Sequence, residues 1–198
     1  MTETFAEDLE GSNVRSDPPE GEAEEEGERG SPETEEDETR GPGPARLSRP
    51  GADFIARFEG CVLRLYNDPT NNATIGVGHL VHMGPINGGE PAEFKKGITR
   101  ERALALLTED AKKAARAVRR SITQPLKQTE FDALVSFTFN CGEGSLRKST
   151  LRRRLNAGNR PAVRSELMKW VYSGGKKLPG LVRRRQAEGA LFVNGKYK

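Results

Sequence analysis

The spacing of apolar residues divides the chain into a polar first part and a patterned remainder. Residues 1–50 contain few apolar side chains and are rich in Glu, Gly, Pro and Ser, so they cannot bury enough surface to offset the entropy of an ordered chain. From residue 51 onward, apolar positions recur with the periods of helices and strands. We therefore expect a disordered acidic tail over residues 1–50 and one folded domain over residues 51–198, which is long enough to form a substantial core.

The first part of this domain predicts one helix followed by a small sheet. Apolar residues fall on one side of a short helix over residues 51–60, which ends at a glycine. Residues 62–66 and 73–77 have the composition of strands, and turn-forming residues separate them over 67–72. This pattern predicts a hairpin or a three-stranded sheet, followed by a long surface loop over residues 79–97.

Beyond Thr99 the pattern is helical throughout. Thr99 is a good N-cap for a helix whose apolar residues lie three and four apart as far as Val118, before Pro125 interrupts it. Thr129 and Asp132 resemble a weak capping box at the start of the next helix. Further helices are expected over residues 150–156, 161–172 and 181–192. One helix, a small sheet and then many helices predict an α+β fold in which the sheet forms its own lobe.

Two carboxylic acids near the predicted sheet have contrasting local surroundings. Glu59 lies at the C-terminal end of the first helix beside Phe58, where the helix dipole and the apolar neighbour both favour the protonated form. Asp68 lies in a polar turn, whose N–H and hydroxyl donors favour the ionised form. Hydrolysis of a glycosidic bond requires such a pair, one carboxyl to donate a proton and one to activate water or stabilise the sugar cation. Thr74, on the strand that leaves the turn, is placed to hold that water.

The segments that contain these residues resemble the active-site signature of the phage-type (T4-like) lysozymes, glycoside hydrolase family 24. The likeness rests on Phe58-Glu-Gly60, Leu65-Tyr-Asn-Asp68 and Thr74-Ile-Gly-Val-Gly-His79, with the family's spacing between Glu, Asp and Thr. It continues through residues 128–140 and 180–185 and covers about residues 51–192 in all. The tail has no counterpart in this resemblance.

The resemblance implies a lysozyme-like fold, with a small antiparallel β lobe, a larger helical lobe and a cleft between them. It implies a muramidase that hydrolyses the β-1,4 bond between N-acetylmuramic acid and N-acetylglucosamine in bacterial peptidoglycan. Glu59 would be the general acid, and Asp68 and Thr74 would position and activate the water. The family is associated with inversion at the anomeric carbon, which corresponds to carboxyl groups roughly 6.5–9.5 Å apart.

The same resemblance assigns further residues. Asn140 and Trp170 fall where the family lines its cleft, although a large aromatic residue on an amphipathic helix is more often part of the core. His79 and Asp110 fall where the family forms a structural ion pair between the lobes. The family usually has Gly where this chain has Asn71, and Asn is the next-best residue for a turn with positive φ. The loop over residues 82–96 is longer than in the shortest members, which would change the rim of the cleft or the substrate preference.

Metal and cofactor chemistry is not expected. His79 and His82 have a possible metal spacing, but no Cys or further His lies nearby to complete a site. No cofactor is implied. Cys61 and Cys141 are too few for a disulfide framework, so two free thiols are the expectation and a disulfide between them is the alternative.

Charge differs sharply between the two parts of the chain. Residues 1–50 hold 16 acidic and 5 basic residues, a net charge of −11, and residues 51–198 hold 13 acidic and 27 basic residues, a net charge of +14. The anionic polymers of a cell wall would attract such a domain. The arginine triplets point in three directions on a helix and lie beside no nucleic-acid-binding motif, so binding of nucleic acid is not expected. The tail is interpreted as a solubilising extension, with masking of the basic domain as the alternative.

The sequence also indicates where the protein is made. The first ten residues are acidic and predict no secretory signal, and the uncharged run over residues 69–89 is too often broken to span a membrane. We expect synthesis in the host cytoplasm as a monomer, followed by action on the wall after a pore-forming, holin-like partner, particle delivery or cell death releases the protein. The alternative functions are a non-catalytic peptidoglycan-binding module on the same fold and a basic nucleic-acid-binding protein.

Overall fold

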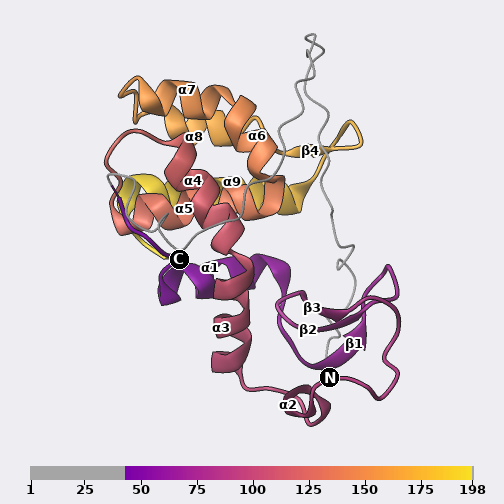
Figure 1. Cartoon of the computed structure of the whole chain (residues 1–198). Coiled ribbons are helices and arrows are strands. Elements are labelled where there is room, and N and C mark those ends of the chain that lie inside the picture. Colours follow the sequence, from indigo (N-terminus) through magenta and orange to yellow (C-terminus); the bar gives the residue numbers. More distant parts are fainter. Residues whose placement is uncertain (1–42, 198) are drawn as a thin grey trace, which may run out of the picture.

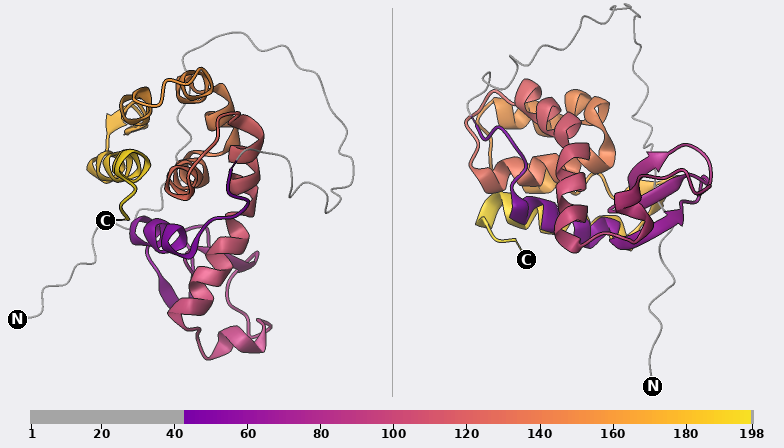
Figure 2. Two further views of the ribbon diagram at one scale, coloured as in Figure 1. Left: turned by 90° about the vertical axis from the view of Figure 1, so that its left-hand side faces the viewer. Right: turned by 60° about the horizontal axis from the view of Figure 1, so that its bottom comes forward.

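The computed structural model describes residues 43–197, which form two lobes joined by a helix (Figure 1). The β lobe contains a three-stranded sheet and the short helix α2, and the helical lobe contains most of the other helices. Helix α3 leads from the β lobe into the helical lobe (Figures 1 and 2). This arrangement confirms the predicted α+β fold. The predicted disordered tail lies outside the described residues except for residues 43–50.

Helix α1, Arg49–Glu59, begins two residues earlier than predicted. The side chain of Ser48 caps it by accepting a hydrogen bond from Gly51 N at 3.0 Å, and a proline lies in its first turn. Leu47 is buried in the core, and Ser48 N donates to Asp132 Oδ1 at 3.1 Å. Packed structure therefore starts before residue 51, in a segment whose composition resembles the tail but which contains these helix-start signals.

The β lobe contains the predicted sheet in its three-stranded form. Strand β1, Val62–Asn67, pairs antiparallel with β2, Ala73–Gly76, which pairs antiparallel with β3, His79–His82. In the turn between β1 and β2, Asn71 has the predicted positive φ, at 62°. The prediction of one long loop over residues 79–97 was wrong, because residues 79–82 pair as β3 and Ala92–Lys95 form helix α2.

The long helix predicted after Thr99 is two helices. Thr99 does cap α3, Arg100–Asp110, through a hydrogen bond from Arg102 N at 3.2 Å. The chain turns at Ala111, and α4 then covers Lys112–Ser121. Buried positions continue with helical spacing on both sides of Ala111, so apolar periodicity alone did not mark the break.

The predicted capping box of the next helix was also wrong. Helix α5, Gln128–Cys141, begins after Lys127, whose backbone N–H donates to the Glu130 carboxylate at 2.8 Å. Asp132 is instead a fully buried carboxylate. It accepts hydrogen bonds from Ser48, from Gln128 Nε2 at 2.8 Å and from the Tyr197 hydroxyl at 2.6 Å. The carboxylate thus joins the start and the end of the described chain to α5.

Helix α5 is the centre of the helical lobe, with α1, α4, α6 and α9 packed around it (Figure 2). Of the remaining predictions, the helix over residues 150–156 is confirmed, and those over 161–172 and 181–192 are displaced at their ends. The chain also pairs as a short hairpin where Gly174 and Gly175 have positive φ, which shortens the predicted 161–172 helix. The elements beyond α5 are α6 Glu143–Lys148, α7 Thr150–Asn156, α8 Ala162–Leu167, β4 Tyr172–Ser173, β5 Lys176–Lys177 and α9 Pro179–Asn194.

Candidate active site

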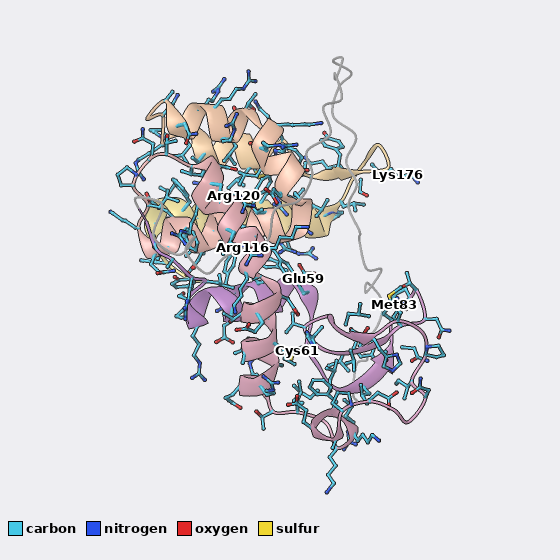
Figure 3. All side chains as sticks on the ribbon, in the orientation of Figure 1. Glu59, Cys61, Met83, Arg116, Arg120 and Lys176 are labelled. Carbon is cyan, nitrogen blue, oxygen red and sulfur yellow. The ribbon has the colours of Figure 1, made fainter. Side chains whose placement is uncertain are left out.

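Glu59 is the last residue of α1 and lies where the helical lobe meets the β lobe (Figure 3). Gly60 ends the helix with a positive φ of 79°, which a residue without Cβ adopts readily. The Glu59 side chain is 30% exposed, and its Oε1 lies 2.6 Å from Arg184 Nη1. Its carboxylate is therefore open to solvent on one side and paired with a cation on the other.

The cation that contacts Glu59 belongs to a buried network in the helical lobe. Arg184, on α9, is 4% exposed, and its Nε lies 3.2 Å from Glu188 Oε1. Its guanidinium also donates to Ser136 O at 3.3 Å and lies 5.5 Å from the centre of the Phe58 ring. Burial lowers the pKa of Arg184, but the carboxylates of Glu59 and Glu188 outweigh burial and raise it above its usual value.

Sequence reasoning missed this network. Arg184 lies 125 residues from Glu59, and the arginine triplet that contains it was interpreted as pointing in several directions. That interpretation holds, since Arg184 and Arg185 are buried while Arg183 is exposed. The acid four residues further along the same helix, Glu188, was the available signal, because a buried arginine requires a carboxylate within reach.

Asp68 lies in the turn between β1 and β2. Its Oδ1 accepts hydrogen bonds from Thr70 N and Thr70 Oγ1, both at 2.8 Å, and from Asn72 N at 2.9 Å. The bonds from the Asn72 backbone and the Thr70 side chain lower the pKa of Asp68, and they outweigh the smaller effect of desolvation. The ionised form is thus favoured, as the polar composition of the turn indicated.

Thr74, on β2, is 3% exposed, and its Oγ1 donates to the Asn72 carbonyl at 3.1 Å. Asp68 N donates to the same carbonyl at 3.0 Å. The fold therefore brings Asp68 and Thr74 onto one hairpin, where both contact one peptide group. Glu59 lies just before the first strand of that hairpin.

His79 and Asp110 lie together. The Nδ1 atom of His79, on β3, is 3.0 Å from Asp110 Oδ2, at the end of α3. This contact joins the sheet to the helix that leads into the helical lobe. Its role as a structural ion pair, which the resemblance implied, stays a prediction.

Asn140 and Trp170 are half-buried in the helical lobe. The side-chain oxygen of Asn140 accepts a hydrogen bond from Arg185 Nη2. The Trp170 ring packs edge-on against Phe137, with ring centres 5.3 Å apart. These contacts give both residues a packing role, and their contact with substrate stays a prediction.

The remaining predictions concern metals, thiols and membranes. Within residues 43–197, no group of three or more His, Cys, Asp or Glu side chains is arranged to hold a metal ion. Cys61 and Cys141 are free thiols, and burial raises the pKa of Cys141 to about 11. In the same part of the chain, no helix combines the length and the apolar character needed to cross a membrane.

Known proteins resemble this chain in sequence and in overall fold. The Phage lysozyme family matches residues 56–188. The endolysin of Bacillus phage B103 is 38% identical over 154 residues, which are 77% of this chain but only 56% of that protein, so this chain spans about half of its length. The solved endolysin of Escherichia coli O157:H7 phage FAHEc1 is 36% identical with a TM-score of 0.64, and the match covers 77% of this chain and 96% of that one.

A second solved structure, the muramidase domain of SpmX from Asticaccaulis excentricus, is 32% identical with a TM-score of 0.62. The match covers 75% of this chain and 97% of that domain. The family match includes Glu59, Asp68, Thr74 and Arg184, the residues whose contacts are described above. The chain therefore belongs to the phage lysozyme family and is an enzyme of the lysozyme type.

Proposed function

We propose that this lysozyme is a muramidase that hydrolyses the β-1,4 bond between N-acetylmuramic acid and N-acetylglucosamine in bacterial peptidoglycan and thereby lyses bacteria. Glu59 is the general acid that protonates the leaving oxygen, and Asp68 and Thr74 position the attacking water. The observation that carries this proposal is the contrast between the two carboxyls. Asp68 is stabilised as an anion by three hydrogen bonds, and Glu59 lies at the adjoining end of α1 with one face open to solvent.

The contacts of Asp68 and Thr74 suit the binding of water. Oδ1 of Asp68 accepts all three of those bonds, so Oδ2 can accept a proton from water. The Thr74 hydroxyl donates to the Asn72 carbonyl, so its oxygen lone pairs can accept the second water proton. A water that donates to both groups directs its own lone pair away from them, toward the anomeric carbon of a bound sugar.

Arg184 has two effects on Glu59 in this mechanism. It fixes the carboxyl position through a 2.6 Å contact, and it stabilises the carboxylate that forms once the proton has left. The sequence prediction that Glu59 retains its proton considered only the helix end and Phe58. That prediction did not include Arg184, which contacts the Glu59 carboxylate directly.

The test is clearing of a peptidoglycan suspension by the wild-type protein and by Glu59→Gln and Asp68→Asn. We expect wild type to clear the suspension and both variants to lose nearly all activity while still sedimenting with the wall. Mass spectrometry of the fragments would show reducing ends, and anhydro-muramic ends would instead indicate a lytic transglycosylase. Clearing by Glu59→Gln at the wild-type rate would exclude Glu59 as the acid, and binding without clearing by wild type would indicate a non-catalytic wall-binding module.

Delivery to the wall is a separate part of the proposal. We propose that the protein is made in the cytoplasm and reaches peptidoglycan through a pore-forming partner, in a particle or after cell death. Expression with and without a membrane pore former tests this. Lysis that requires the pore former supports the first route, and lysis without it excludes a dependence on such a partner.

A further inference from the structure

Asn72 connects the two groups that we assign to water activation. Its backbone N–H donates to Asp68 Oδ1 at 2.9 Å, and its carbonyl accepts hydrogen bonds from Asp68 N at 3.0 Å and Thr74 Oγ1 at 3.1 Å. Its side-chain Nδ2 donates to Thr70 Oγ1 at 2.8 Å, and Thr70 in turn donates to Asp68. The position of this one residue therefore sets the relative position of Asp68 and Thr74.

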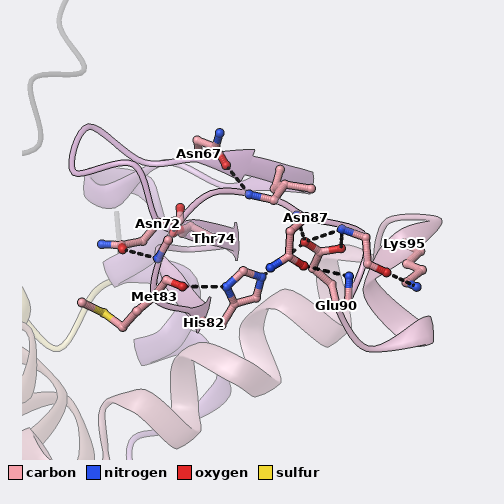
Figure 4. Close-up of polar contacts among 12 residues, drawn as sticks. Asn67, Asn72, Thr74, His82, Met83, Asn87, Glu90 and Lys95 are labelled. Carbon is pink, nitrogen blue, oxygen red and sulfur yellow. Dashed lines mark hydrogen bonds and ion pairs between the residues drawn. The ribbon is translucent and has the colours of Figure 1, made fainter.

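The side chain of Asn72 is held from outside the hairpin by the loop of residues 83–90 (Figure 4). Gly84 N donates to Asn72 Oδ1 at 2.9 Å, and Ala73 N donates to Gly84 O at 2.8 Å. Further along the loop, Ile86 N donates to Asn67 Oδ1 at 3.0 Å. The 83–90 loop thus contacts Asn67, which precedes Asp68, and Asn72, whose backbone N–H donates to Asp68.

Glu90 organises this loop from within. Its side chain is 2% exposed, and its carboxylate accepts hydrogen bonds from Asn87 N at 2.7 Å and Gly88 N at 3.1 Å. His82 Nε2 lies 3.3 Å from the same carboxylate (Figure 4). The backbone donors, together with His82, lower the pKa of Glu90 to about 2, so the loop is folded around a permanent buried anion.

His82 closes the loop onto the end of β3. Its Nδ1 lies 2.9 Å from Met83 O while its Nε2 faces Glu90. Because both ring nitrogens face acceptors, both contacts are hydrogen bonds only when the ring carries two protons. The Lys95 ammonium, from α2, donates to Gly88 O at 2.6 Å and adds a second cation to this end of the loop.

We propose that the 83–90 loop is a positioning element for the reaction, and that Asn72 is the positioning residue through which it aligns Asp68 and Thr74. The proposal rests on the proposed function, since it concerns the same two groups. It gives a role to the segment from His82 to Glu90. The sequence alone indicated only that this segment belongs to a long loop at the rim of the cleft and that His82 has a possible metal spacing with His79. None of these contacts involves Glu59, so the loop acts on the water and not on the proton donor.

The first test is Asn72→Ala, which removes both side-chain bonds and leaves the backbone contacts to Asp68 in place. We expect kcat on peptidoglycan to fall roughly tenfold with KM changed by less than about twofold, because a misaligned water slows chemistry without removing a sugar contact. The acid limb of the pH–rate profile should move slightly to higher pH, because the Asn72 side chain is one of the smaller causes that lower the pKa of Asp68. Asn194→Ala, at the exposed end of α9, is the matched control and should leave both constants unchanged.

A conservative variant separates the two side-chain bonds of Asn72. Asn72→Asp keeps the oxygen that accepts from Gly84 N and loses the donor to Thr70. Measured on the pH plateau, its kcat should lie closer to wild type than that of Asn72→Ala. The same kcat for both variants would overturn the role of the Gly84 contact.

The second test links Asn72 to the loop. Glu90→Ala should lower kcat in the same way, with Glu93→Ala, an exposed acid on α2, as the control. If both residues act along one path, the Asn72→Ala/Glu90→Ala double variant should lose less than the product of the two single losses. The proposal is overturned if folded Asn72→Ala retains wild-type kcat, or if the two losses simply multiply. An inactive wild-type protein would instead refute the proposed function, so the two failures are distinguishable.

Discussion

The two lobes hold their carboxyl groups by different means. In the helical lobe, Glu59 is contacted by Arg184, which is buried and shared with Glu188. In the β lobe, Asp68 is held by Thr70 and Asn72, which lie within four residues of it. One group depends on a buried charge network between distant segments, and the other depends on hydrogen bonds within a single turn.

This difference determines how each side of the site should respond to change. Removing one member of a buried ion network leaves an uncompensated charge and affects the whole lobe. Removing one of several donors to a partly exposed carboxylate leaves the others in place, so the effect is local and graded. Variants on the helical side should therefore lose stability, and variants on the β side should instead show changes in titration and rate.

The largest expected effect is on the stability of the helical lobe. Glu188 is 0% exposed and lies 3.2 Å from Arg184 Nε and 2.9 Å from Arg185 Nη1. Glu188→Gln removes the only charge that both arginines share among the residues described, so we expect the free energy of unfolding to fall by about 3–5 kcal/mol. Urea denaturation measures the loss. The control is Glu109→Gln, which breaks an exposed pair with Lys112 and should change the free energy of unfolding by less than about 1 kcal/mol. Equal losses in the two variants would show that burial does not determine how much an ion pair contributes to stability.

The next effect is on catalysis. Arg184→Lys keeps the charge but loses the planar fork that reaches Glu59, Glu188 and the Ser136 carbonyl together. We expect kcat on peptidoglycan to fall roughly ten- to hundredfold, because Glu59 is no longer held in one position. The stability loss should be smaller than for Glu188→Gln. Arg183→Lys, at the exposed neighbouring position, is the control, and wild-type kcat in Arg184→Lys would mean that the guanidinium geometry is irrelevant to Glu59.

The same contrast explains how much of the site could be predicted. The turn around Asp68 was predictable because its donors, its Asn71 conformation and the following strand are all encoded within a few residues. Arg184 was not, because no local pattern pairs a residue on α9 with the end of α1. The family resemblance supplied Glu59, Asp68 and Thr74, but it did not supply the contacts that hold them.

The fold shows the same limit. Thr99 and residues 150–156 were placed correctly, since a cap and an apolar period act within one helix. The break at Ala111 was missed because buried residues recur with the same helical spacing in α3 and in α4. The carboxylate of Asp132 was misassigned to a helix cap, because its partners Ser48 and Tyr197 come from opposite ends of the described chain.

A smaller effect is expected in the Asp68 turn. Thr70→Val keeps the shape and the backbone donor but removes the hydroxyl that donates to Asp68 Oδ1 at 2.8 Å. Hydrogen bonds lower the pKa of Asp68, so its contribution to stability is present above the usual carboxyl range and is lost as the pH falls through the lowered value. The variant should raise the pKa of Asp68 and move this loss to higher pH. Carbon-13 NMR titration of the Asp68 carboxyl measures the shift, with Thr123→Val as the control. An unchanged titration in Thr70→Val would show that the Thr70 hydroxyl does not lower the pKa of Asp68.

The smallest effect is expected from the titration of His82 beside the 83–90 loop. Hydrogen bonds to Met83 O and Glu90 raise the pKa of His82 above its usual 6.5. The contribution of His82 to folding stability is therefore complete below about pH 6.5, and it is lost as the pH rises through the higher pKa of the folded state. Glu90, with a pKa of about 2, stays ionised throughout this window, so the transition belongs to the histidine. The Gly88 amide, which donates to Glu90, should report it as a chemical-shift change that His82→Gln abolishes. If the variant showed the same transition, a group other than His82 would close the loop.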